Sequence, residues 1–122
     1  MIDRVRLSAG ARNQLIALKR KTGLEHNNSI CRYALCLSLE NESLPPQEIF
    51  SFNGGLEIDW RTFTGGNEDL YWNLVAIRVA RDGKVPDDEG VRGCLTAHLH
   101  RGLSFLAAKS EAELQELFSK LI

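Results

Sequence analysis

The first 40 residues contain the pattern that most constrains the fold. Residues 3–7 alternate polar and apolar side chains, which is typical of a short strand with one buried face. Ser8 can cap the helix that follows, and Gly23 is placed to end it. A lone strand leaves both backbone edges unpaired, so this strand needs a partner elsewhere in the chain or in a second copy.

Two helices of different character are predicted in this N-terminal stretch. The first has an amphipathic stripe that consists of Ala11, Leu15, Leu18 and Thr22. The second, over residues 30–39, is so apolar that we expect it to be buried nearly all round, against its own domain and a second subunit. The candidates for its N-cap are Asn27, Asn28 and Ser29.

The middle of the chain breaks the helical pattern. Pro45 and Pro46 stop any helix, and glycine-rich turns flank residues 56–60. That segment alternates, which predicts a short extended segment with Glu57 and Asp59 on one face. Its other face consists of Leu56, Ile58 and Trp60.

Three further helices are predicted after the middle segment. The helix over residues 68–82 has Leu70, Leu74 and Ile77 on one side, with Trp72, Val75, Ala76 and Val79 broadening it to near burial. The helix over residues 87–107 has a core stripe of Leu95, Leu99, Leu103 and Leu106, and contains Gly93 and Gly102, which permit close helix contact or a local break. A capping box of Ser110 and Glu113 begins the last helix, whose apolar face is Leu114, Leu117, Phe118 and Leu121.

These patterns predict a mainly α, compact helical domain over residues 1–122, with a short N-terminal strand and a small irregular or β insertion around residues 50–66. Its parts are a basic strand-helix-helix segment (1–40), an acidic glycine-rich connector (41–67) and a helical part (68–122). No apolar run approaches the ~20 residues that cross a bilayer. The charged N-terminus is unlike a signal peptide, so we expect a cytoplasmic protein.

Charge is distributed unevenly along the chain, although the formal net charge is only −1. Residues 1–39 hold seven Lys and Arg against two acids, whereas residues 40–70 hold one base against seven acids. This predicts a basic face that binds DNA and a separate acidic face that points away from the duplex. The predicted DNA-binding residues are Arg4, Arg6, Arg12, Lys19, Arg20, Lys21 and Arg32.

Part of this basic set also has a purely structural explanation. Lys19, Arg20 and Lys21 occupy the predicted last turn of the first helix, where cations suit the negative end of the helix dipole. The absence of interleaved acids, together with the other four arginines, favours the DNA-binding interpretation.

The residues that could support catalysis or metal binding have simpler interpretations. Glu57 and Asp59 could hold a metal or act in acid–base chemistry, but solvated or partner-facing acids explain their alternation more economically. His98 and His100, two apart on a helix, point to nearly opposite sides and cannot chelate one metal together. Cys31, Cys36 and Cys94 are interpreted as buried small hydrophobes, with a redox or sulfur-carrying role as the less favoured alternative. We therefore predict no catalytic residue, no metal and no cofactor.

Three strings carry a resemblance to a known family: LKRKTGLEHNNSICRYALCLSLE, FNGGLEIDWRTFTGG and LTAHLHRGLSFLA. Over residues 4–108 the chain resembles the DndE family, small proteins of the bacterial DNA phosphorothioation (Dnd) machinery. The resemblance implies a largely helical, non-enzymatic tetramer that binds duplex DNA, with a preference for nicked DNA, alongside other Dnd modification proteins. It places the DNA contact on surface basic residues that match Lys19, Arg20 and Lys21, flanking Arg12.

Two other functions remain open from the sequence. The order of strand, helix, turn and helix resembles a ribbon-helix-helix repressor, in which paired strands from two chains would read DNA through Arg4 and Arg6. A less favoured alternative is a metal-dependent enzyme that uses Glu57, Asp59 and His98.

Overall fold

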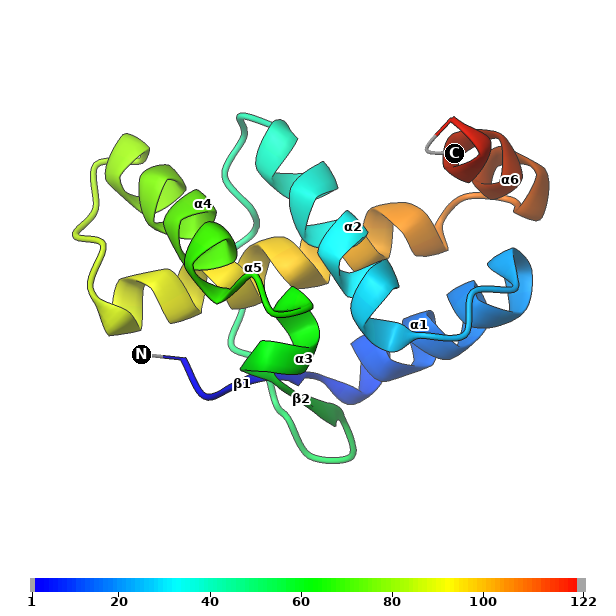
Figure 1. Cartoon of the computed structure of the whole chain (residues 1–122), viewed down its shortest axis with the longest axis horizontal. Coiled ribbons are helices and arrows are strands. Elements are labelled where there is room, and N and C mark those ends of the chain that lie inside the picture. Colours follow the sequence, from blue (N-terminus) through cyan, green and yellow to red (C-terminus); the bar gives the residue numbers. More distant parts are fainter. Residues whose placement is uncertain (1, 121–122) are drawn as a thin grey trace.

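A long helix, α5 (Asp88–Ala107), runs through the middle of the molecule, and the other elements pack around it (Figure 1). The computed structural model describes residues 2–120. Within them, six helices and one two-stranded antiparallel sheet confirm the predicted mainly helical fold. The other elements are β1 (Arg4–Leu7), α1 (Ala9–Thr22), α2 (Asn27–Glu40), β2 (Leu56–Asp59), α3 (Trp60–Thr64), α4 (Glu68–Arg81) and α6 (Glu111–Ser119).

The predicted core stripe of α5 is confirmed. Leu95, Leu99, Leu103 and Leu106 are all buried. Gly102 lies so close to α2 that a Cβ atom at this position would overlap the carbonyl group of Ala34. No atom of the described chain lies near the corresponding position of Gly93. Close helix contact therefore explains one of the two glycines.

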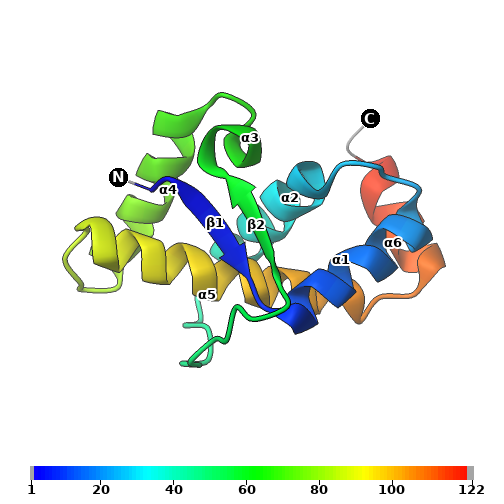
Figure 2. The same ribbon diagram turned by 90° about the horizontal axis from the view of Figure 1, so that it is seen from below.

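The strand β1 pairs within its own chain. It runs antiparallel to β2, with Arg4 opposite Asp59 and Arg6 opposite Glu57. Viewed from below, the sheet and α1 lie together in front of α5 (Figure 2). Since β2 supplies the partner strand, β1 is not half of an intermolecular ribbon in this fold.

The prediction that α4 is buried nearly all round is wrong. Leu70, Leu74 and Ile77 are 55%, 39% and 62% exposed, whereas Val75 and Val79 are buried. Apolar residues recur at helical spacing on two sides of this helix, Leu70, Leu74 and Ile77 on one and Val75 and Val79 on the other, so periodicity alone does not select the packed side. The tertiary structure turns α4 so that Val75 and Val79 lie in the core, leaving an apolar stripe on the surface.

The predicted N-cap of α2 is also wrong. The helix begins at Asn27 after His26, which makes no side-chain cap, and the Asn28 side chain instead donates to the Thr62 carbonyl oxygen at 3.0 Å. Within the single chain its burial is one-sided, because Cys36 and Glu40 are exposed, and the predicted contact with a second subunit stays a prediction. The buried side lies against α5.

The local capping signals of α1 and α6 are confirmed. The Ser8 hydroxyl accepts from the Ala11 amide, and Gly23 ends α1 with φ 74°, in the left-handed region that favours glycine. Ser110 and Glu113 form the predicted capping box of α6. Leu121, assigned to the apolar face of this helix, lies outside the described residues. Over residues 2–120 no helix is long and apolar enough to cross a membrane.

Candidate nucleic-acid interface

The exposed side of α1 carries a short cationic row. Arg12, Ile16 and Arg20 are exposed and lie at i, i+4 and i+8, so they follow one line along the helix. The helical rise places the backbones of the two arginines about 12 Å apart. Neither arginine side chain, nor that of the half-buried Lys19, makes a hydrogen bond or ion pair with any residue of the described chain. These three cations are available to a ligand.

Lys21 is used inside the fold. Its Nζ donates to the carbonyl oxygens of Ala107 and Lys109, at 3.4 and 3.3 Å. These carbonyls lie at the C-terminal end of α5, where helical carbonyl groups lack partners within the helix. Of the three adjacent basic residues, Lys21 therefore has a structural role.

Arg32 is also held by the protein. It extends from α2 to α3, where its Nη1 donates to the Phe63 carbonyl oxygen at 2.8 Å, and its Nη2 donates to the Ser29 hydroxyl at 3.4 Å. The side chain is only partly accessible. It joins α2 to α3 rather than extending into solvent.

Arg4 and Arg6 lie on the solvent face of the sheet and share one carboxylate. Their nitrogens lie 3.0 and 3.2 Å from the two oxygens of Glu57. The prediction that the acidic segment forms a face separate from the basic one is therefore wrong here. The cause is the strand register, which places Glu57 directly opposite Arg6.

The second acid of the predicted pair has a local role. Asp59 caps α3, and its Oδ2 accepts from the Thr62 amide at 3.2 Å. Across residues 2–120, no group of three His, Cys, Asp or Glu side chains is arranged to hold a metal ion.

Two buried arginines, which the sequence reasoning did not single out, hold the C-terminal end of α2. Arg78, 5% exposed, donates to the carbonyl oxygens of Leu39, Asn41, Glu42 and Ser43 and pairs with Asp82. Arg101, 9% exposed, donates to the Ser38 hydroxyl and to the carbonyl oxygens of Ser38, Asn41 and Ser43. A signal for Arg78 exists, since it shares a helix face with Val75.

Both histidines of α5 are buried and point to different elements, as their spacing predicts. His98 Nδ1 lies 2.8 Å from the Ser38 hydroxyl, which also accepts from Arg101. Burial, together with the nearby Arg78 and Arg101, lowers the pKa of His98 to about 4. His98 is therefore neutral at physiological pH.

His100 connects α5 to the start of α1. Its Nε2 accepts from the Ser8 amide at 3.1 Å, and its Nδ1 lies 2.7 Å from the Thr96 carbonyl oxygen. The carbonyl can only accept, so Nδ1 carries the proton and the ring is neutral. Burial lowers the pKa of His100 in agreement with this state.

The cysteines do not share one environment. Cys31 is buried, and this burial raises its thiol pKa to about 12. Cys94 is half-buried, with its pKa raised to about 11, again chiefly by burial. Cys36 is exposed, so the prediction that all three are buried is wrong for this residue.

The fold has a counterpart among known structures. The crystal structure of DndE from Escherichia coli B7A, described as involved in DNA phosphorothioation modification, is similar to this chain with a TM-score of 0.67. The two are 22% identical, and the similarity covers 89% of this chain and 99% of the other. At this level of identity the comparison establishes a shared fold. No curated protein matches the chain.

A family model identifies the chain more directly. The model is described as the DNA sulphur modification protein DndE, and it matches residues 4–113. This range includes β1, α1 and all of α5, the elements that carry and support the cationic row. Since the match covers most of the chain, the protein belongs to the DndE family.

Proposed function

We propose that this protein is a non-catalytic DNA-binding component of the DNA phosphorothioation system. The observation that carries the proposal is the row of Arg12 and Arg20 on α1, exposed and without an acidic partner in the described chain, in a member of this family. Lys19 adds a third cation beside the row. The remaining predicted basic residues contribute less, because they are engaged by Glu57 or by backbone carbonyls.

The row suits the phosphate backbone better than the base edges. Arginine contacts to phosphate position a protein on the duplex without reading its sequence. Each phosphate neutralised releases counterions, so the affinity falls as salt rises, with a slope of about −0.9 in log K against log salt for each contact. We therefore expect salt-sensitive binding with little sequence preference.

The salt dependence of DNA binding tests the proposal. An Arg12→Ala, Arg20→Ala double variant should reduce the magnitude of the slope by roughly 2 for each subunit that contacts DNA. Arg81→Ala is the matched control, since Arg81 is an exposed arginine on α4. An unchanged slope in the double variant, or an equal change in the control, would show that α1 is not the DNA-binding surface.

A preference for nicked DNA is the finer part of this proposal. Binding should be measured on intact, nicked and single-stranded DNA of one sequence at one salt concentration. Tighter binding to the nicked duplex supports the preference. Equal binding to nicked and intact duplex would limit the function to general duplex binding.

Assembly is the other half of the proposed function, with a tetramer expected. The stripe of Leu70, Leu74 and Ile77 on α4 supports it, because exposed apolar stripes of this kind mark association surfaces. A tetramer would present several copies of the cationic row to one DNA molecule and strengthen binding through avidity. Its mass in solution should be several times 13.7 kDa, and Leu74→Lys, Ile77→Lys should reduce it. A monomeric wild-type protein would contradict this part.

Within the modification system we propose that the chain also contacts other Dnd proteins. The repressor alternative is less well supported, because β1 has its strand partner in β2. The enzyme alternative loses its proposed acids, because Glu57 pairs with two arginines and Asp59 caps α3. Wild-type function in a Glu57→Ala, Asp59→Ala variant would argue further against catalysis.

A further inference from the structure

The outer edge of β1 has main-chain groups without partners. The Trp60 amide donates to the Asp3 carbonyl oxygen at 2.9 Å, so the two strands exchange hydrogen bonds at Asp3 and at every second residue after it. Arg4 and Arg6 lie between these positions, and their N–H and C=O groups point away from β2. Neither residue has a main-chain hydrogen bond on that side to any part of residues 2–120.

The next outward-facing amide along this edge, that of Ser8, has a hydrogen-bond acceptor within the protein. The Ser8 amide donates to His100 Nε2, and this contact closes the edge where β1 meets α1. The described chain supplies no equivalent acceptor for the amides of Arg4 and Arg6. Within β1, the open part of the edge consists of these two residues.

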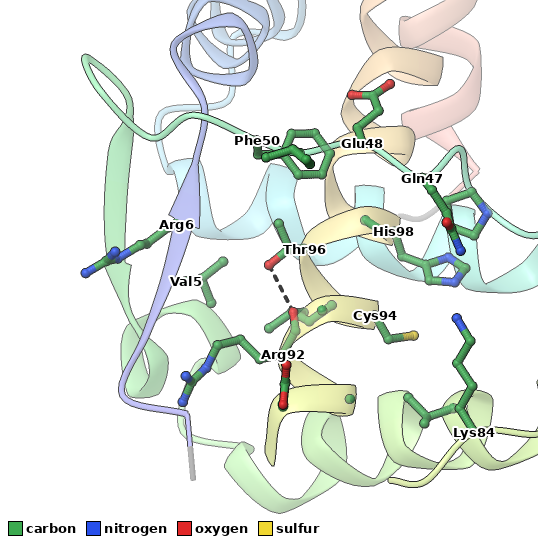
Figure 3. A pocket seen from close by; sticks show the side chains of 18 of the residues that line it. Val5, Arg6, Gln47, Glu48, Phe50, Lys84, Arg92, Cys94, Thr96 and His98 are labelled. Carbon is green, nitrogen blue, oxygen red and sulfur yellow. Dashed lines mark hydrogen bonds between the residues drawn. The ribbon is translucent and has the colours of Figure 1, made fainter. Parts of the chain in front are cut away.

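This edge borders a groove of about 1240 Å³. Its other walls are the extended segment over residues 44–52 and the N-terminal half of α5. In Figure 3, Val5 points from β1 toward α5 and Arg6 points away from it, while Phe50 marks the segment that crosses the groove. The residues of α5 that line the groove here, Gly93, Thr96 and Ala97, have small side chains. The space beside Gly93 is open, because no atom lies within 4 Å of the position that a Cβ would take there.

We infer that this groove receives an extended segment of a partner protein, which adds to β1 as a third strand. A neighbouring strand lies about 4.8 Å from the edge it joins, and its main chain would satisfy the free groups of Arg4 and Arg6. This partner contact lies apart from the cationic row on α1 and does not depend on DNA binding there.

The charged side chains of β1 indicate which residues the partner segment contains. The two charged side chains of β1, Arg4 and Arg6, are both cations, whereas the acids of this face, Glu57 and Asp59, lie on β2, one strand further from a third strand. A third strand places every second side chain beside these arginines, where acidic residues form favourable cross-strand pairs. Its alternate side chains face Gly93 and Ala97, where small apolar residues fit. The partner segment therefore alternates acidic and apolar residues.

The same arginines exclude a second copy of this edge as the occupant. Two β1 edges paired with each other would bring Arg4 and Arg6 of one copy against arginines of the other. Like charges in directly opposite positions destabilise a strand pair. The charge pattern thus favours a different chain.

The first test uses the full-length protein and a short synthetic peptide in which glutamate and valine alternate, with a lysine–valine peptide as control. We expect saturable binding of the acidic peptide alone. Hydrogen exchange at the amides of Arg4 and Arg6 should slow at least ten-fold on binding. No saturable binding up to about 1 mM peptide, or equal binding of the lysine peptide, would overturn the inference.

Two chemical changes separate strand addition from simple charge attraction. Arg6→Pro removes the outward-facing amide, whereas Arg6→Ala removes the charge and keeps the amide; both should weaken binding, the proline variant at least ten-fold more. Retained protection of the Val5 and Leu7 amides shows that the β1–β2 pairing is intact.

In the peptide, N-methylation of every glutamate should abolish antiparallel pairing, and N-methylation of every valine should abolish parallel pairing. Equal binding of both methylated peptides overturns strand addition, whatever Arg6→Pro does.

Hydrogen exchange at the amides of Arg4 and Arg6 also tests two other possible occupants of the edge, a second copy of this chain and nucleic acid. Protection of Arg4 and Arg6 that grows with protein concentration, without peptide, would assign the edge to a second copy. Protection by duplex DNA but not by the peptide would assign it to nucleic acid. Either result overturns the inference.

Discussion

Gly102 of α5 lies directly against the carbonyl group of Ala34 in α2, so close that no side chain fits between the two helices. Buried leucines of α5, among them Leu99 and Leu103, lie on both sides of this point in the sequence. Glycine at this position sets the distance between the two helices.

Replacing Gly102 by alanine should destabilise the protein. The new methyl group would overlap the backbone of α2, and such overpacking costs about 1–3 kcal/mol or more. Gly93→Ala is the matched control in the same helix, and it should be neutral or stabilise by up to about 1 kcal/mol, because its surroundings are open. Urea unfolding of both variants measures the difference. Equal effects would show that helix propensity, rather than the close contact, governs Gly102.

Truncation of Arg101 should have a large effect on stability. The change Arg101→Met removes five hydrogen bonds from a charged donor to Ser38, Asn41 and Ser43, two of them to the buried Ser38. We expect a loss of about 3 kcal/mol in the free energy of unfolding. Arg81→Ala, an exposed arginine, should change it by less than about 0.5 kcal/mol. A similarly small effect for Arg101 would contradict its role in holding the end of α2.

Substitution of Lys21 should mainly affect stability, whereas substitution of Arg20 should mainly affect DNA binding. Lys21→Ala removes the two contacts to the end of α5 and should lower the free energy of unfolding by about 1 kcal/mol. Arg20→Ala should leave stability nearly unchanged and weaken DNA binding more than Lys21→Ala does. Chemical unfolding and DNA titration at one salt concentration measure the two effects. The opposite ranking would place the phosphate contact at Lys21.

Stability should fall in mild acid because of His98. Its pKa is lowered from 6.5 to about 4, so between these values the unfolded chain binds a proton that the folded chain does not. The stabilisation is present in full above pH 6.5 and is lost as the pH falls toward 4, by about 3 kcal/mol. His98→Gln should reduce this slope in urea unfolding, and His100, also with a lowered pKa, should account for part of what remains. An unchanged slope in the variant would contradict the buried neutral state of His98.

Local signals predicted five of the six helices of the described chain, but not the short α3, whose first residue, Trp60, belongs to the predicted extended segment. Ser8, Gly23 and the pair Ser110 and Glu113 act within one turn of where they stand, so their roles follow from neighbouring residues alone. The stripe of α5 was equally predictable, because one line of leucines has no competing apolar line on that helix. Short-range hydrogen bonds and an unambiguous period are sufficient in such cases.

The cationic site was only partly predictable. The sequence indicates seven basic residues but cannot show which of them the fold uses. Lys21 and Arg32 reach carbonyl groups that are 86 and 31 residues away in the chain, and Glu57 meets Arg4 from a distance of 53 residues. These pairings depend on where distant backbone segments meet. Arg12, Lys19 and Arg20 are distinguished from the rest by the structure.

The sequence by itself determined the helical class, the helix ends that capping residues define and the excess of cations near the N-terminus, since each depends on residues close in the chain. Only the tertiary structure decided which side of α4 is exposed, that β1 pairs with β2, and that Arg78 and Arg101 hold the end of α2. Each of these outcomes is set by packing and hydrogen bonding between segments far apart in sequence, and such contacts leave no local pattern to read.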